Sequence, residues 1–151
     1  MRNTFFKLWI HGILHIAEEG VPIQPELVHP FYHEIEKRFV EQDCPVAAIN
    51  GQPDHVHVLF TQNPLLTLHE TMSFVQGMTQ RWYQLNDAKT GWYKFKWDDG
   101  YCLYSVSESV LEKTQFFIEK QAEIHQNLNF WDERLQLNRL HKVDLSDWVL
   151  T

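Results

Sequence analysis

Short aromatic and branched runs alternate with longer amphipathic segments, and this order constrains the fold more than any other feature of the sequence. The expected strands cover residues 5–16, 44–52, 54–62 and 91–107. The expected helices cover residues 23–42, 67–86 and 108–126. Strands interleaved with helices, including a hairpin between the second and third strands, predict an α+β fold. We expect a ferredoxin-like sandwich, in which an antiparallel sheet carries helices on one face.

The length of 151 residues predicts a single domain over residues 1–151, with a C-terminal extension at about 128–151. No run approaches the ~18 apolar residues of a membrane span, so no membrane partner is expected. The N-terminal apolar stretch is interrupted by Lys7 and His11, which favours a strand over a signal peptide. Cys44 and Cys102 lie far apart in apolar contexts, which indicates reduced thiols and a cytoplasmic location.

The charge balance is acidic, with 13 Lys and Arg residues against 20 Asp and Glu residues, giving a net charge of -7. Binding to nucleic acid depends on neutralising phosphates, so this balance argues against a general affinity for it. A local basic groove is compatible with the same total.

The stretch GQPDHVHVLF, residues 51–60, contains the strongest local signal for chemistry. Residues i and i+2 of a strand share a face, so His55 and His57 are expected to project side by side. Two neutral imidazoles in this arrangement can chelate one divalent metal, with Asp54 as a hydrogen-bonding partner. The spacing alone is equally typical of two half-buried histidines beside a turn aspartate.

Several segments together resemble the HUH-type single-tyrosine insertion-sequence transposases, which include the REP-associated tyrosine transposases. PDHVHVLF resembles the His-hydrophobic-His motif, and DDGYCLYSVSES resembles the segment before the family's tyrosine helix. FFIEKQAEIH is similar to the tyrosine helix itself, and NFWDERLQLNRLHKV to the C-terminal extension. The segments occur in the family's order and span nearly the whole chain.

The resemblance implies a metal-dependent enzyme that nicks and joins single-stranded DNA beside a hairpin. His55, His57 and Gln121 match the ligands of a divalent metal, Mg²⁺ or Mn²⁺, that polarises the scissile phosphate. A helix tyrosine attacks that phosphate and forms a phosphotyrosine. The family's proteins are dimers, so a homodimer is expected here.

The chain departs from the family at the nucleophile, because the tyrosine's position is occupied by Phe117. A benzene ring has no oxygen to attack phosphorus, so cleavage through a phosphotyrosine is expected to be impaired. Three explanations stay open: a degenerate or repurposed relative, an engineered Tyr→Phe change, or a different nucleophile. Tyr101 and Tyr104 are the weak substitutes, and both also suit packing positions; an activated water is a further alternative.

The family's basic surface is also reduced in this sequence. The segment HIAEEGVPI stands where the family has Thr-Lys-x-Arg, and the second helix retains only Arg81. Lys94, Lys96 and Trp97 form the best remaining basic and aromatic stretch for DNA, although alternation of this kind is also typical of a half-exposed strand.

Three functions therefore remain in competition. The first is a transposase, active or formerly active, that handles hairpin-bearing single-stranded DNA. The second is a domesticated DNA-binding module without catalysis. The third is a dimeric protein-interaction domain whose histidines are relics and whose acidic surface binds a protein.

Overall fold

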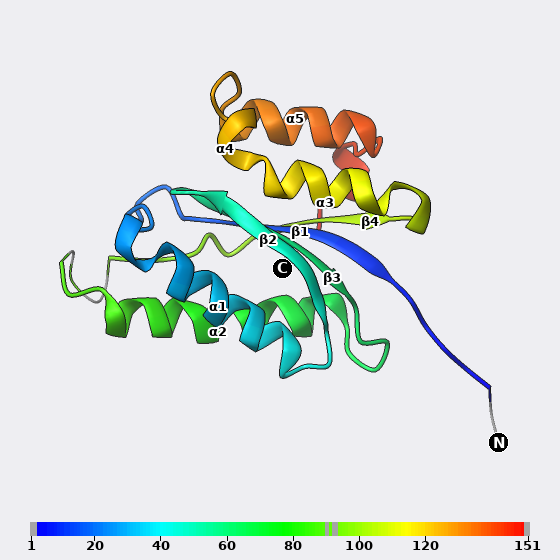
Figure 1. Ribbon diagram of the computed structural model, residues 1–151, viewed down its shortest axis with the longest axis horizontal. Coiled ribbons are helices and arrows are strands. Elements are labelled where there is room, and N and C mark those ends of the chain that lie inside the picture. Colours follow the sequence, from blue (N-terminus) through cyan, green and yellow to red (C-terminus); the bar gives the residue numbers. More distant parts are fainter. Residues whose placement is uncertain (1–2, 90, 92–93, 150–151) are drawn as a thin grey trace.

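A single four-stranded antiparallel sheet organises the computed structural model, which describes residues 3–89, 91 and 94–149 (Figure 1). The strands, in their order across the sheet, are β2 (Val46–Gln52), β3 (His55–Thr61), β1 (Trp9–His15) and β4 (Cys102–Val106). The central strand β1 pairs antiparallel with both β3 and β4. This order confirms the predicted α+β fold of ferredoxin-like type.

Two helices form the layer expected on one face of the sheet. They are α1 (Val28–Val40), preceded by the short 3-10 turn η1 (Pro25–Leu27), and α2 (Leu68–Asn86). Pro30 lies in the first turn of α1, where a backbone N–H has no partner within the helix. The predicted capping box is present at α2, because the Thr67 hydroxyl accepts from the Glu70 backbone and the Glu70 carboxylate accepts from the Thr67 backbone.

The C-terminal helices add a layer on the opposite face (Figure 1). In chain order these elements are η2 (Glu108–Val110), α3 (Leu111–Glu119), α4 (Gln121–Ile124), α5 (Phe130–Leu140) and η3 (Leu145–Asp147). The single helix predicted over 108–126 is therefore wrong in detail, because it is interrupted at Lys120, whose φ of -97° and ψ of 21° are not helical. Gln121 therefore begins the separate short helix α4.

Alternation along the strands divides the interior into two parts. Leu14, Val56 and Val58 pack in the core beneath α1 and α2. Ile13 packs instead with α5 residues, including Phe130, in a separate cluster on the other face. The histidines of β1 and β3 share this second face, so the strand period sets them against the C-terminal helices.

The segment predicted as extended over 91–107 is a regular strand only at β4, although Trp97 forms an isolated bridge with Ile16. Positions 92 and 93 lie outside the described residues. Both Cys44 and Cys102 are free thiols. Among the described helices, none is both long and apolar enough to span a membrane.

Candidate metal centre

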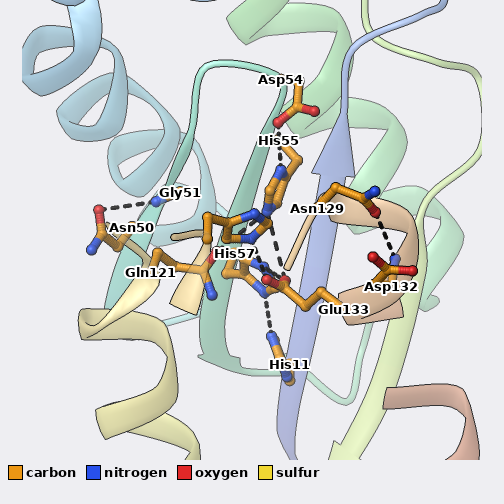
Figure 2. Close-up of polar contacts among 11 residues, drawn as sticks. His11, Asn50, Gly51, Asp54, His55, His57, Gln121, Asn129, Asp132 and Glu133 are labelled. Atoms are coloured by element: carbon orange, nitrogen blue, oxygen red, sulfur yellow. Dashed lines mark hydrogen bonds and ion pairs between the residues drawn. The ribbon is translucent and has the colours of Figure 1, made fainter. Parts of the chain in front are cut away.

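His55 and His57 lie side by side on β3 and are fully buried. Their ring centroids are 5.1 Å apart, and both rings point toward the C-terminal layer (Figure 2). The expectation from the strand period is therefore correct in geometry: two imidazoles project from one face of one strand. Both rings are completely buried, whereas the sequence was also compatible with a half-buried strand.

The Nδ1 atoms of both histidines already have partners. His55 Nδ1 lies 2.7 Å from a carboxylate oxygen of Asp54, and His57 Nδ1 lies 2.7 Å from Nε2 of His11 (Figure 2). Such partners fix the tautomer and orientation of an imidazole, which is the usual arrangement around a metal-binding histidine. The Nε2 atoms are consequently the ones directed into the centre.

A carboxylate from the C-terminal extension reaches these Nε2 atoms. Glu133, on the first turn of α5, contacts His57 Nε2 and lies 3.6 Å from His55 Nε2. Its second oxygen contacts Nε2 of His125. The ligand atoms of His55, His57 and Glu133 all lie within 4.8 Å of one another, so this group could hold a metal ion. Asn129 caps α5 by accepting from the Asp132 backbone at 2.9 Å and thereby fixes where Glu133 is presented (Figure 2).

Sequence reasoning missed Glu133 and gave His125 no role. His125 follows Gln121 by four residues, which is about one helical turn. This spacing was the one sequence signal that His125 could lie on the same side of the helix as Gln121. Glu133 follows a further loop, and nothing local in the sequence indicates that α5 turns back over the sheet.

Gln121, the predicted third ligand, is buried at the start of α4. Its Oε1 lies 3.3 Å from His55 Nε2, and its Nε2 has no hydrogen-bond partner within the described residues. The structure thus places Gln121 beside His55.

Burial and charge act against each other at this centre. Burial alone raises the pKa of the Glu133 carboxyl, but the adjoining imidazoles of His55 and His57 hold it well below its usual range. Burial lowers the pKa of His55, yet Asp54 and Glu133 raise it to about 9. Burial lowers the pKa of His57 and of His11, so these rings favour the neutral form that binds metals.

Five buried polar atoms of this centre have no partner in hydrogen-bond geometry among the described residues. They are Nε2 of His57, Gln121 and His125, and both carboxylate oxygens of Glu133. Several of these atoms nevertheless lie at ion-pair distance from one another. Since buried polar atoms are normally satisfied, convergent donor atoms of this kind fit a metal ion between them.

Phe117 projects from α3 toward the same centre. Its ring centroid lies 5.6 Å from that of His57 and 6.0 Å from that of His11, edge-on in both cases. The position expected for the nucleophile is therefore adjacent to the histidines, but it presents a hydrocarbon edge to them.

Neither substitute tyrosine has a free hydroxyl directed at the histidines. Tyr104 is buried on the histidine face, and its hydroxyl donates to Asn138 at 2.6 Å; burial raises its pKa far above the usual value. Tyr101 packs against the core under α1 and α2, where its hydroxyl lies 2.8 Å from His69 Nδ1. Tyr101 is thus on the wrong face of the sheet for attack at this centre.

The residues predicted to contact DNA are dispersed. Arg81 is exposed on α2, and Lys94 is exposed before β4. Lys96 is exposed and paired with Glu19 at 3.3 Å. Trp97 is only 2% exposed and donates to the Thr79 hydroxyl, so its ring lies within the core and offers no surface for base stacking.

A cavity of about 460 Å³ opens beside Asp54, the partner of His55. Asp54, Phe130 and Trp131 form part of its wall, together with Glu18 and Asp98. Its lining includes three carboxylates and neither lysine nor arginine. The charge of this cavity therefore repels a phosphate backbone.

The comparisons with known proteins agree with this architecture. The family model described as "Transposase IS200 like" matches residues 4–121. A crystal structure of a proposed transposase from Deinococcus radiodurans R1 is 21% identical and superposes with a TM-score of 0.62, covering 80% of this chain and 95% of that one. A REP-associated tyrosine transposase solved with a REP hairpin is 10% identical, with a TM-score of 0.60 over 100% of this chain and 91% of the other. No curated protein sequence matches the chain.

Proposed function

Because this chain belongs to the IS200-like transposase family, we propose that it binds hairpin-bearing single-stranded DNA and holds a divalent metal at His55 and His57 without cleaving the strand. The observation that carries the proposal is the Phe117 ring at the edge of the histidine pair. A covalent mechanism needs an oxygen there, and phenylalanine supplies none. The recombination step is therefore lost, while the fold that surrounds it persists.

The metal part of the proposal is supported by the donor atoms. Two buried imidazoles with fixed Nδ1 partners, a buried carboxylate and a nearby amide are suited to one divalent cation. A divalent cation bound there would supply positive charge that offsets the buried Glu133 carboxylate. The chain's own contribution is to orient the Nε2 atoms of His55 and His57 and to exclude water around them.

The DNA part is supported by the relative solved with a REP hairpin, whose fold this chain shares. Arg81, Lys94 and Lys96 are the exposed cations that we assign to phosphate contacts, with Lys96 released from Glu19 on binding. Few such cations are present, so affinity is expected to be modest and strongly dependent on salt.

We further propose that residues 1–151 form one domain and that two copies associate. The two free thiols support a reducing, cytoplasmic setting. Size-exclusion chromatography with light scattering would give the mass of the assembly, and a monomer at micromolar concentration would contradict the dimer.

A second function is favoured by one specific observation, the cavity lined by Glu18, Asp54 and Asp98. Together with the net charge of -7, it suits a basic protein segment better than a nucleic acid. In that case the chain is a protein-interaction domain that has kept the transposase fold.

The test is equilibrium binding to a pool of hairpin-bearing single-stranded DNAs over a salt series. We expect selective binding whose log affinity falls with log salt by about 0.7 per phosphate contact. Arg81→Gln should weaken binding and reduce that slope by roughly one contact. Arg139→Gln, an exposed arginine on the opposite layer, is the matched control and should change neither. Absence of binding at low salt would favour the protein-interaction function.

A further inference from the structure

We propose that His55, His57, His125 and Glu133 form a closed, four-ligand site for a cation of the zinc class, which fastens the C-terminal helices to the sheet. This inference rests on the metal site of the proposed function and specifies its ligands and its role. It differs from the open Mg²⁺ or Mn²⁺ site that the family resemblance implies.

Four donor groups from three parts of the chain face one another at this centre. His55 and His57 come from β3, His125 from the residue that ends α4, and Glu133 from α5. One oxygen of Glu133 faces the two β3 imidazoles, and its other oxygen faces His125. The ring centroids of His55 and His125 are 4.8 Å apart, so His125 is as close to His55 as His57 is. The ligand atoms that lie within 4.8 Å of one another are those of His55, His57 and Glu133, and His125 joins this group through its contact with the second Glu133 oxygen.

The contacts among Glu133, His57 and His125 lack the alignment of hydrogen bonds. Nε2 of His57, Nε2 of His125 and both oxygens of Glu133 lack any partner in hydrogen-bond geometry among the described residues, although they lie close together. Buried donor atoms that contact one another without hydrogen-bond alignment remain available to a cation. His55, His57 and one oxygen of Glu133 are close enough together to share one, and the other oxygen of Glu133 faces His125.

The surroundings of the His55 and His57 rings also fit a metal site. The outer nitrogen of His55 is paired with Asp54, and that of His57 with His11, each at 2.7 Å. Metal-binding histidines usually have such partners, which hold the ring and keep Nε2 directed inward. Phe117 and Phe130 add apolar walls, with ring centroids 5.6 Å from His57 and 4.6 Å from His55 respectively.

The donor set selects the class of cation. Three imidazole nitrogens and one carboxylate make a four-coordinate site of the kind that zinc prefers. Mg²⁺ prefers oxygen ligands in octahedral geometry and keeps several of its waters, which this buried centre does not accommodate. A site with four protein ligands also leaves no position for a phosphate oxygen, which is the feature that separates structural from catalytic zinc sites.

The consequence is that the metal joins α5 to β3 across the interior. His125 and Glu133 flank the loop between α4 and α5, so their coordination fixes both sides of that loop. We expect the segment 125–140 to be held against the sheet in the loaded protein and to open more readily without metal.

The experiment is a titration of metal-stripped full-length protein with Zn²⁺ and Co²⁺, measured by competition with a chromophoric chelator. We expect one equivalent to bind, with the intense visible absorption of four-coordinate Co²⁺. Glu133→Gln and His125→Asn should each weaken zinc binding at least about 100-fold. His33→Asn, an exposed histidine on α1, is the control. Hydrogen exchange of residues 130–140 should slow when zinc is added.

The outcomes separate this inference from the proposed function. Weak, six-coordinate Co²⁺ absorption in the unaltered protein would overturn the closed site even if a variant fails to fold. Unchanged zinc affinity in both Glu133→Gln and His125→Asn would also overturn it while leaving a metal at His55 and His57. If the unaltered protein binds no metal, both the four-ligand zinc site and the metal at His55 and His57 are refuted. DNA binding is then tested separately by the salt-series assay.

Discussion

Replacing Phe130 with alanine tests whether the C-terminal helices and the sheet unfold as one unit. Phe130 begins α5 and is only 6% exposed, in a cluster with Ile13, Tyr104 and Leu137. Removing roughly 150 Å² of buried apolar surface at about 25 cal/mol per Å² costs about 4 kcal/mol, within the usual range of 3–5 kcal/mol for such a change.

Urea denaturation followed by far-UV circular dichroism measures this cost. For a slope of about 2 kcal/mol per M, the midpoint should fall by roughly 2 M in one cooperative transition. Trp131→Ala is the matched control, because the Trp131 ring follows Phe130 in the chain but is 64% exposed, with contacts to Phe130 and Arg134. That change should cost less than about 1 kcal/mol. Equal midpoints for the two variants, or a separate early transition for Phe130→Ala, would refute docking of α5 as part of the core.

Three further predictions follow from single contacts. Gly51→Ala should destabilise the protein by about 1–3 kcal/mol, because a Cβ there would lie 2.2 Å from the His55 carbonyl oxygen. Gly77→Ala on α2, with open space around it, should instead stabilise the protein by about 0.5–1 kcal/mol. Thermal melting measures both changes, and a lower melting temperature for Gly77→Ala than for Gly51→Ala would contradict them. Tyr104→Phe should cost about 1 kcal/mol in urea denaturation through the lost bond to Asn138, and a cost near zero would contradict that bond. Burial raises the pKa of the Cys102 thiol, so alkylation at pH 8 should be slower in the folded protein than in urea, by roughly tenfold for each unit of pKa; equal rates would show an exposed thiolate.

The fold was predictable because its signals are local. Strand period, helical spacing and the capping box at Thr67 each depend on neighbours within a few residues, and the sheet order follows from the connections. The same period placed His55 and His57 on one face. The break at Lys120 and the burial of Trp97 were not predictable in this way, because both are set by packing against distant elements.

Only part of the candidate centre could be predicted from the sequence, because its other residues are brought in by contacts between distant elements. His55, His57 and Gln121 belong to motifs that can be recognised locally. Glu133 is 76 residues beyond His57 in the chain, and its contact depends on how the loop after α4 turns. Nothing in the composition of 128–151 distinguishes this carboxylate from the other acidic residues of the extension.

The central claim is that DNA binding has survived without covalent cleavage, and one sample tests both halves. Hairpin-bearing single-stranded DNA is incubated with the protein and Mn²⁺, and then divided between a native and a denaturing gel. The account predicts a shifted complex in the native gel that weakens with salt, and no DNA-linked protein in the denaturing gel. A covalent species formed by the chain with Phe117 intact, or no shifted complex even at low salt, would contradict it.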